Sequence, residues 1–556
     1  MAAETSEGGD PLRPPDAARE NTVSLPVRRR VQPEGGPRAG YSVAPFRDLV
    51  LDFEETELGS LRFVARGRGQ LTVQVGESLP EIRDPDRRYF EQYAIDPIPL
   101  KPVRANITLP QRALRYVRFS STGEAELRNV SFDARVWPSK ELGRFESSDT
   151  ELNAIWKTAV ATLRSNMHDF YLDGIRRDGL VWHDGPLTLD AYERVFFDAD
   201  LSRQTLIAET LPGHPSVRDL GIIDAPMYTV IAFEREYLVR GDAGFSRMFR
   251  DRIEDILRLY ASLQDGRGFV DARSVEPYGY FPDWSATAES GPDAHGAPAY
   301  GQMLLAGAFA AGGRLARAWK DQAAAAHYES ESQRIRSAVR STFWKPEQGL
   351  YANGFKRDGE FDPRTTPFAQ SFAVAFDIAD ARDHETLFRC LDDRGARPEH
   401  FSLSQVVELT AYARAGRADG ALKRLRAAWL PMIRRGYHRF FEDIWPAKDH
   451  TAQLAMYGRR YANSLCHAWA GAAPVMAISR GVLGVEPTEP GYRVCSVTPQ
   501  RCGLEWVRGA VPTPSGSIEV EWRKSEGQVT LPAGVTARLR DGRLLRGPGQ
   551  FPTILQ

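Results

Sequence analysis

One short segment of the chain, residues 171–186, combines the side chains that acid–base chemistry requires. It reads YLDGIRRDGLVWHDGP. Its glycines and the helical patterns on either side place it in a loop, and loops held on a rigid scaffold are where binding and catalytic groups collect. A solvated, charged turn is the structural alternative. The candidate residues in this segment are Asp173, Arg176, Arg177, Asp178, Trp182 and Asp184.

A second acidic group lies far along the chain, where Glu442 and Asp443 occupy the long connection 435–459. Structureless connections of this length in a compact domain are usually functional. If the two connections converge, their carboxyl groups can carry out glycoside hydrolysis, in which one acid protonates the leaving oxygen and one base activates water. A separation of roughly 6.5–9.5 Å gives inversion and roughly 5–5.5 Å gives retention.

Several of these residues have a structural interpretation as well. Asp184 precedes Gly-Pro and fits the cap of a helix that begins at Pro186 equally well. Arg176 and Arg177 fit a local ion pair, or they fix the carboxylates or grip a charged substrate group.

Aromatic residues and one histidine extend the candidate site. Flat apolar faces in pockets often contact sugar rings, although packing in the core is the alternative for at least half of the tryptophans. His467 lies within a helical pattern and is either a structural histidine or a ligand of the substrate. Besides Asp173, the predicted substrate-binding residues are Arg177, Trp182, Asp283, Trp284, Trp445 and His467, with Trp469 as a further aromatic candidate.

The charge balance and the missing motifs narrow the chemistry. The 72 basic and 73 acidic residues argue against a nucleic-acid surface and suit a neutral substrate such as a sugar. There is no run of 18 apolar residues, so no membrane span is predicted. The sequence contains no His-Glu-x-x-His, P-loop, Gly-x-Ser-x-Gly or convincing Rossmann motif, so neither a metal nor an organic cofactor is predicted. It gives no oligomeric state.

Cysteine usage and the N-terminus say little about the compartment. Cys495 and Cys502 could approach each other across strands, but four thiols in this length do not make a disulfide framework. The first residues lack a basic region followed by an apolar one. A cytoplasmic location is therefore expected, or a periplasmic or secreted one if a signal was trimmed.

The period of the hydrophobic residues divides the chain into four parts. Residues 1–37 are rich in Pro, Gly, Glu and Arg and predict a flexible leader. Alternation over 38–143 predicts an N-terminal β-sandwich, and its return over 483–556 predicts a small terminal β domain. Residues 144–482 show helical patterns with hardly any strand between them.

The helical part predicts an (α/α)6 barrel of six helical hairpins, in which alternate connections converge on one rim. An α-solenoid is the alternative, but it requires a repeat of roughly 30–50 residues, and we find none. Ser148 and Glu151 predict a capping box at the first helix. The predicted helices span 149–170, 186–199, 201–212, 224–239, 242–263, 297–317, 319–343, 366–379, 382–394, 402–415, 417–434 and 460–481.

Three stretches of the sequence resemble the bacterial α-L-rhamnosidases of glycoside hydrolase family 78 and their close relatives. The first, DGIRRDGLVW from Asp173 to Trp182, is similar to the family's Asp-x-x-x-Arg-Asp-Glu segment, and the second is FFED at 440–443. The third runs from Ser464 through LGVEPTEPGY at 483–492 to Pro-Gln at 499–500. The resemblance covers about residues 45–556.

This resemblance implies a β-sandwich, an (α/α)6 catalytic barrel and a second β-sandwich. It also implies inverting hydrolysis of terminal α-L-rhamnosides without an organic cofactor. By position in the motifs, Glu442 is the expected general base, and Asp173 and Asp178 are expected in the sugar subsite.

One departure from the family bears on the chemistry. Gly179 stands where the family places its general-acid glutamate, and the family's Trp-x-Gly-Asp reads Trp-His-Asp-Gly at 182–185. Losing a positioned acid removes about 10²–10⁴ in rate. Three outcomes follow: Asp178, or next Asp184, acts as the acid; the reaction is an elimination beside a uronic acid; or the protein binds sugar without cleaving it.

Overall fold

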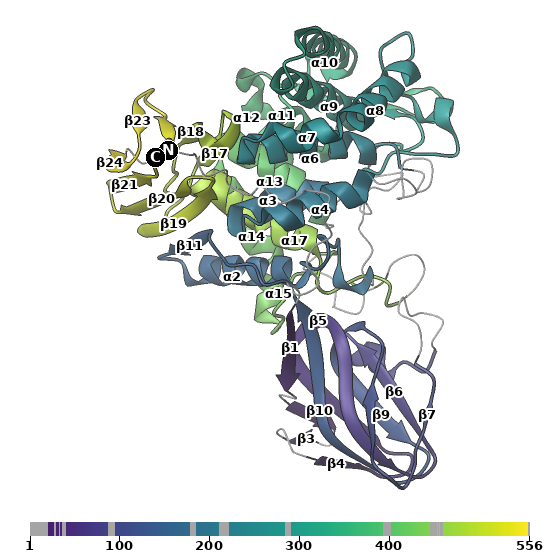
Figure 1. Ribbon diagram of the computed structural model, residues 1–556. Helices are drawn as coiled ribbons and strands as arrows, with labels where there is room; N and C mark the ends of the chain where they lie inside the picture. The colour runs from purple at the N-terminus through teal and green to yellow at the C-terminus, as the bar shows by residue number, and fades with distance from the viewer. Residues whose placement is uncertain are drawn as a thin grey trace, which may run out of the picture.

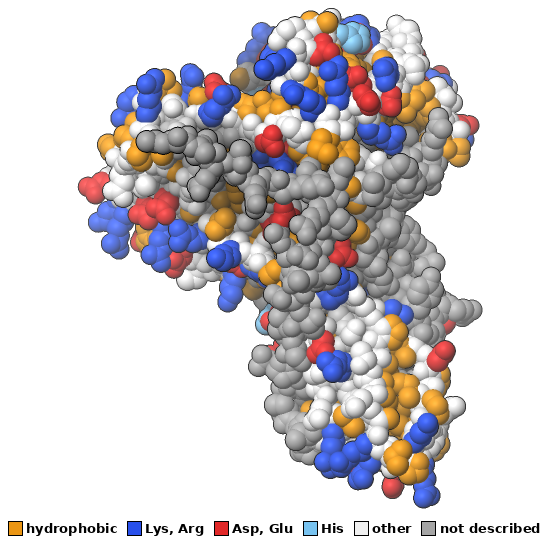
Figure 2. Space-filling view, in the orientation of Figure 1, with side chains coloured by type: hydrophobic (Ala, Val, Ile, Leu, Met, Phe, Trp, Pro, Cys, Tyr) orange, Lys and Arg blue, Asp and Glu red, His pale blue; other side chains and the backbone are white. Residues whose placement is uncertain are grey.

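The structure is a computed structural model that describes residues 21–26, 29–32, 34–35, 40–86, 95–177, 185–210, 222–283, 291–392, 402–444, 453, 455 and 460–553. Figure 1 shows an N-terminal sheet (purple) at one end of the molecule, a helical part, and C-terminal sheets (yellow) beside the helices. Within the described residues, no helix is long and apolar enough to cross a membrane. Basic and acidic side chains are interspersed on the helical face that Figure 2 shows, in keeping with a net charge of −1.

The N-terminal sheet is organised around one long strand. β5 (Asp48–Gly67) pairs first with β9 (Arg112–Ser121) and then with β10 (Ala125–Val136). Leu61 and Phe63 are buried, as the alternation predicts, because every second residue of a strand faces the same side. The other elements of this part are β4 (Gly40–Val43), β6 (Gln70–Gly76), α1 (Leu79–Arg83), β7 (Ile98–Pro99) and β8 (Ala105–Thr108).

Three further strands lie in the stretch predicted to be a flexible leader. β1 (Asn21–Pro26) pairs with β10, β2 (Arg29–Gln32) pairs with β5, and β3 (Glu34–Gly35) pairs with β2. The prediction of a leader over 1–37 is therefore wrong for these residues. A strand added to an existing sheet is held by backbone hydrogen bonds, so its sequence need not alternate in hydrophobicity.

Every predicted helical segment contains a helix. Two segments are divided, 242–263 at Phe249 and 417–434 at Trp429. The segment 460–481 becomes helical only at Ala468. The helices are α2 (Thr150–Ser165), α3 (Gly185–Val195), α4 (Ala199–Thr210), α6 (Ala225–Arg240), α7 (Ala243–Met248), α8 (Arg250–Leu263), α9 (Ala299–Ala318), α10 (Gln322–Phe343), α11 (Pro367–Ala375), α12 (His384–Asp392), α13 (Ser402–Arg414), α14 (Ala418–Ala428), α15 (Leu430–Arg434), α17 (Ala468–Met476) and the π-helix η6 (Ala477–Val482).

Six of these helices contact one another in a closed cycle, which we call the helix ring. α3 contacts α6, α6 contacts α9, α9 contacts α11, α11 contacts α13, α13 contacts α17, and α17 returns to contact α3. Every residue of α17 is buried, so it lies in the interior on all sides. Outer helices such as α2 and α10 pack against the ring.

The segments that precede the ring helices also contact one another. Hydrogen bonds link the segments before α6, α9 and α13 and link the start of α17 to the segment before α3, so the N-terminal ends of these ring helices lie on one rim. The partial positive charges of those helix ends favour carboxylates there. The linking hydrogen bonds join the N–H of Ala468 to the carbonyl of Asp173 (2.7 Å), the N–H of Phe281 to Asp224 (3.0 Å) and the N–H of Ser404 to Asp283 (2.8 Å).

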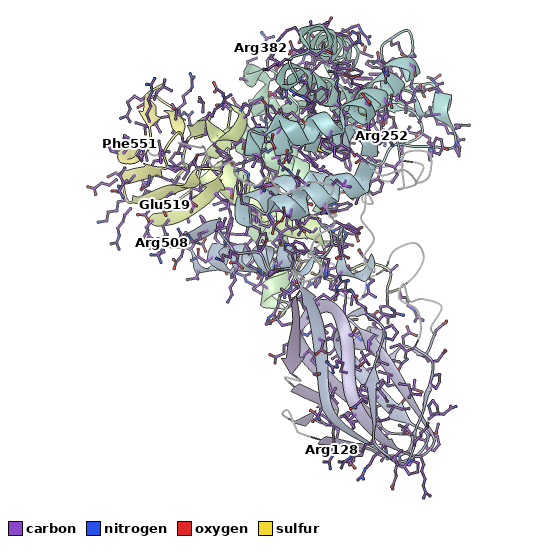
Figure 3. All side chains as sticks on the ribbon, viewed as in Figure 1. Arg128, Arg252, Arg382, Arg508, Glu519 and Phe551 are labelled. Carbon is purple, nitrogen blue, oxygen red and sulfur yellow. The ribbon has the colours of Figure 1, made fainter. Side chains whose placement is uncertain are left out.

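The C-terminal part consists of two sheets. The predicted alternation in β20 (Gly516–Arg523) is confirmed, because Val520 and Trp522 are buried, whereas Glu519 lies on the outer side (Figure 3). Cys495 and Cys502 are free thiols rather than a disulfide. The sheets are β11 (Arg144–Ser147), β19 (Trp506–Thr513), β20, β21 (Glu526–Leu531) and β24 (Gly549–Thr553), and β17 (Val485–Pro487), β18 (Val494–Val497), β22 (Thr536–Leu539) and β23 (Leu544–Arg546). Short strand pairs between helices involve β12 (Ala297–Pro298), β13 (Trp344–Lys345), β14 (Leu350–Tyr351), β15 (Gly354–Phe355) and β16 (Phe361–Asp362).

The first helix begins one residue later than the predicted capping box requires. The carboxylate of Asp149 accepts hydrogen bonds from the N–H groups of Glu151 (2.9 Å) and Leu152 (3.0 Å). Ser148 instead accepts the N–H of Glu505 (2.9 Å) and so joins this helix to the C-terminal part. An aspartate satisfies the exposed N–H groups of a helix as well as a serine does.

We expect Asp149→Ala to lower the free energy of unfolding by about 1 kcal/mol, because the cap of α2 is lost. Asp149→Asn retains the capping oxygen and is expected to lose less than half as much, although it weakens the ion pair with Arg426. Chemical denaturation measures both variants. An asparagine variant as unstable as the alanine variant contradicts the capping role.

Candidate active site

The connection after α2 carries the first candidate carboxylate. Asp173 is buried, and its Oδ1 accepts the N–H of Gly174 at 2.6 Å. The preceding Tyr171 stacks on Tyr192 of α3, with ring centroids 3.7 Å apart. These contacts fix the backbone on both sides of Asp173. A 3-10 turn follows at 175–177.

Two later segments join this connection through backbone hydrogen bonds. The N–H of His467 donates to the carbonyl of Phe440 (2.9 Å), and the N–H of Glu442 donates to the carbonyl of Ser464 (3.3 Å). Gly174 and His467 form an isolated antiparallel bridge. A Cβ on Gly174 would lie 3.0 Å from the imidazole of His467, so this close approach requires a residue with a minimal side chain.

The histidine lies between the two candidate carboxylates. Its Nε2 is 3.7 Å from Oε2 of Glu442 and 3.9 Å from Oδ2 of Asp173. The three side chains are each at most 2% exposed. These separations exceed a normal hydrogen bond, but in a buried site they allow strong ionic attraction when the imidazole is protonated. Carboxylates that are remote in sequence thus meet at one imidazole.

An aromatic ring completes this cluster. Trp469 packs against His467 with ring centroids 4.7 Å apart. Trp469 is only 1% exposed, which favours packing in the core over the alternative role of a sugar platform.

Arg176 binds the N-terminal sheet. Its guanidinium contacts Glu81 (Nη1 to Oε1 2.6 Å, Nη2 to Oε2 3.1 Å) and Glu77 (Nε to Oε1 3.2 Å). Glu77 also accepts the N–H of Leu465 and the hydroxyl of Ser464 (3.4 Å). Arg176 therefore forms an ion pair, but with glutamates far away in the sequence instead of the local partners that were predicted. This pair connects the Asp173 loop to the region of β6 and α1.

Arg439 makes the corresponding contact on the second loop, three residues before Glu442. Its Nη1 lies 2.8 Å from Oε2 of Glu55, and its Nη2 bonds Glu57, both on β5. Its Nε donates to the hydroxyl of Ser165 at 2.7 Å. The N-terminal sheet therefore binds, through pairs of glutamates, both loops that carry candidate carboxylates.

Sequence reasoning missed Asp224, which is also buried on this rim. Its carboxylate accepts hydrogen bonds from the N–H of Phe281 and from the hydroxyl of Tyr300 (3.2 Å), and burial raises its pKa to about 7. Asp-Ala-Pro at 224–226 looks like an ordinary helix start, but Asp224 makes no capping bond to α6. A carboxyl of raised pKa is a candidate proton donor.

The remaining predicted residues are only partly described. Asp283 is buried and binds the N-terminal end of α13 through Ser404, so a contact with substrate stays a prediction. Arg177 closes the 3-10 turn, and its side chain lies outside the described residues. Asp178, Trp182, Asp184, Trp284 and Trp445 also lie outside the described residues. Within the described part of the chain, no group of three His, Cys, Asp or Glu is arranged to hold a metal ion.

Several solved rhamnosidase structures share this fold. The GH78 family rhamnosidase of Bacillus sp. GL1 superposes with a TM-score of 0.72 at 19% identity, over 89% of this chain and 53% of that one. The chain has the fold of a family 78 rhamnosidase. The rhamnosidase from Klebsiella oxytoca with rhamnose bound gives a TM-score of 0.69 at 20% identity, over 83% of this chain and 95% of that one. The Streptomyces avermitilis α-L-rhamnosidase complexed with L-rhamnose gives 0.69 at 17% identity, over 94% of this chain and 50% of that one.

Sequence similarity to rhamnosidases is found over short stretches of the chain. Residues 484–541 match the bacterial alpha-L-rhamnosidase C-terminal domain. The alpha-L-rhamnosidase of Alteromonas sp. (strain LOR) is 40% identical over 62 residues, which is 10% of this chain and 7% of that protein. The chain spans about half the length of the Bacillus rhamnosidase and a small part of the Alteromonas one. The resemblance to family 78 is thus confirmed in the fold and in the C-terminal domain.

The buried ion pairs of this rhamnosidase-like fold predict a dependence of stability on pH. Burial and the neighbouring Glu81 raise the pKa of Glu77 to about 7, even though Arg176 acts in the opposite direction. A carboxyl with a raised pKa binds its proton more tightly in the folded state. The contribution of Glu77 to the free energy of unfolding is complete below pH 4.5 and is lost as the pH rises through 7. This loss is roughly 3 kcal/mol at most.

We therefore expect Glu77→Gln to flatten the fall in unfolding free energy between pH 4.5 and pH 7. Denaturant titrations at several pH values measure this slope. Glu385→Gln, which changes a glutamate whose side chain is 81% exposed, is the matched control and should keep the wild-type slope. If Glu77→Gln also keeps that slope, Glu77 does not titrate in this range.

Proposed function

We propose that the chain is an exo-acting glycoside hydrolase that removes terminal α-L-rhamnose from oligosaccharides or glycosides, with inversion. The observation that carries this proposal is the approach of Glu442 and Asp173 to the single imidazole of His467. The fold supports the same substrate class, because the Klebsiella and Streptomyces structures contain rhamnose.

We also propose that the helix ring and its outer helices form an (α/α)6 barrel within residues 144–482. It lies between an N-terminal β-sandwich that includes β1–β3 and extends to residue 143, and a C-terminal β-sandwich over 483–556 that also includes β11. The contact between α17 and α3 supports a closed barrel over an open α-solenoid, since repeats in a solenoid touch only their neighbours. A barrel brings the connections before its inner helices to one rim, where a sugar can contact several of them.

In this proposal Glu442 is the general base that removes a proton from the attacking water. His467 lies 3.7 Å from this carboxylate, where the imidazole can hold it in position for the attacking water. Asp173 lies in the sugar subsite and accepts hydrogen bonds from sugar hydroxyls. Arg177, Trp182, Asp283, Trp284 and Trp445 are proposed to line the rest of the subsite.

The general acid is proposed to be Asp178, with Asp184 as the next candidate. Gly179 occupies the position of the family's acid and has no side chain that could donate a proton. That substitution keeps two other functions in consideration, a polysaccharide lyase acting on rhamnose–uronate linkages and a carbohydrate-binding protein without turnover. Product analysis separates them, because a lyase forms a new double bond that absorbs in the near ultraviolet.

We expect Glu442→Gln to reduce kcat for an aryl α-L-rhamnoside by about 10²–10⁴, because the amide cannot accept a proton from water. Rhamnose release and the anomeric form of the first product, followed by NMR, measure rate and stereochemistry together. Glu385→Gln is the control for the same substitution on the surface. Wild-type turnover by Glu442→Gln would refute the assignment of the base, whereas thermal stabilisation by rhamnose without product would show binding alone.

Asp178→Asn tests the acid through the leaving group. A nitrophenolate leaves without protonation, whereas a sugar alcohol does not, so we expect a much larger loss on a rhamnose-containing disaccharide than on the nitrophenyl rhamnoside. Asp184→Asn, measured in parallel, shows which aspartate produces this difference. Equal losses on both substrates for both variants would place the acid elsewhere, and Asp224 would be tested next.

A further inference from the structure

A cavity of about 670 Å³ lies at the opposite end of the helix ring from Glu442 and Asp173. Its wall is formed by residues along α6 and α13, by the C-terminal half of α9, by the end of α11, by η6, and by β17 and β18. Small-molecule sites typically occupy about 300–1,000 Å³, so this space accommodates a ligand. None of the described residues that we assign to the rhamnosidase site lines it.

Arginines outnumber carboxylates in the wall of this cavity. Such an imbalance is costly in a partly desolvated space, because the charges are not neutralised by water. The arginines are Arg235, Arg314, Arg336, Arg414 and Arg480, and the carboxylates are Asp190, Glu234, Asp377 and Glu486.

One part of the wall is a buried cluster of three arginines and two carboxylates. Arg480 lies 2.9 Å from Asp190 and 3.0 Å from Glu486. Arg235 contacts the same two carboxylates at 2.6 and 2.9 Å, and Arg194 also pairs with both from behind. The cluster therefore has one positive charge in excess.

The titration of these groups agrees with that count. Burial, together with the neighbouring Arg235 and Arg194, lowers the pKa of Arg480 to about 10, although Glu486 and Asp190 act in the opposite direction. The pKa of Asp190 is depressed despite burial, because three arginines surround it. Arg480 is thus the cation that the carboxylates present do not fully compensate.

The opposite part of the wall contains a cation without a carboxylate within ion-pair distance among the described residues. Arg336 on α10 donates from Nη1 to the backbone carbonyls of Phe376 and Asp377 and from Nε to Ser332, which leaves Nη2 without a partner in this part of the chain. Its neighbours Arg314 and Arg414 are themselves paired, with Glu234 and Asp377. Capping the end of α11 accounts for Nη1 but not for the arginine-rich wall around it.

We propose that this cavity binds a small oxyanion-bearing ligand whose carboxylate or phosphate group is held by Arg336, in a space that also contains the positively charged cluster at Arg480. Guanidinium groups bind both kinds of oxyanion with charge-assisted hydrogen bonds. The hydroxyls of Thr410, Ser496 and Thr498 in the same wall suit the polar remainder of such a ligand. The site is separate from the sugar site, because it lies at the C-terminal ends of the ring helices.

Isothermal titration calorimetry on the full chain, in a buffer free of other oxyanions, tests the proposal with inorganic phosphate and with D-glucuronate. At least one of them is expected to bind saturably at one site and to raise the midpoint of thermal unfolding, while chloride at equal ionic strength does neither. The probe that binds more tightly identifies the kind of oxyanion. Failure of both probes to bind overturns the proposal.

Arg336→Gln is expected to weaken binding about tenfold, and Arg336→Lys less, because one charge-assisted contact is lost or retained. Arg340→Gln is the matched control: Arg340 also lies on α10 and bonds a carbonyl, but it pairs with Asp380 and does not line the cavity. An equal loss in both glutamine variants contradicts the site. Anion binding should persist in Glu442→Gln, so this test does not depend on the rhamnosidase proposal.

Discussion

Buried ion pairs between the N-terminal sheet and two arginines hold the candidate site in place. Arg176 follows Asp173 by three residues, and Arg439 precedes Glu442 by three. Each arginine is bound by two glutamates of the sheet, so neither loop can move without separating buried charges, which is strongly unfavourable. The N-terminal sheet thus positions the two loops that carry Asp173 and Glu442, although it contributes none of the proposed catalytic groups.

The helices and the sheet divide the work of placing these groups. The ring helices bring the connections that precede them to one rim. The partial positive charges at the N-terminal ends of these helices lie on the same rim. Coarse convergence therefore follows from the topology. Contacts from outside the ring set the fine spacing, and His467, at the start of the last ring helix, lies where the two loops meet.

Periodicity allowed most of the helical part to be predicted, because helices on a ring must present an apolar face at a fixed interval. The departures have local causes. Asp149 caps α2 in place of Ser148, and 460–467 stays irregular because its backbone bonds the loops at Asp173 and Glu442 instead of itself. The segment carries apolar residues at helical spacing, but burial between loops requires them as well.

The candidate site could be predicted in part. Motif position singled out Asp173 and Glu442, and His467 was a candidate within a predicted helix; the structure brings all three together. The sequence could not indicate that Glu77 and Glu57 would bind Arg176 and Arg439, because those pairs form across large sequence separations and follow no spacing rule. Asp224 was not predicted for a different reason: Asp-Ala-Pro at 224–226 has the residue pattern of a normal helix start.

Strand β11 has a consequence for how this chain is made. Residues 144–147 pair with β19 (Trp506–Thr513), and Ser148 donates to and accepts from that same region, so a strand near the front of the helical part has its partner near the end of the chain. On the ribosome the front of the chain emerges first and can fold first. β11 then remains an open edge until more than three hundred further residues have been synthesised. In the nascent chain the ring therefore stays open until α17 has been synthesised, and β11 stays unpaired until β19 has left the exit tunnel.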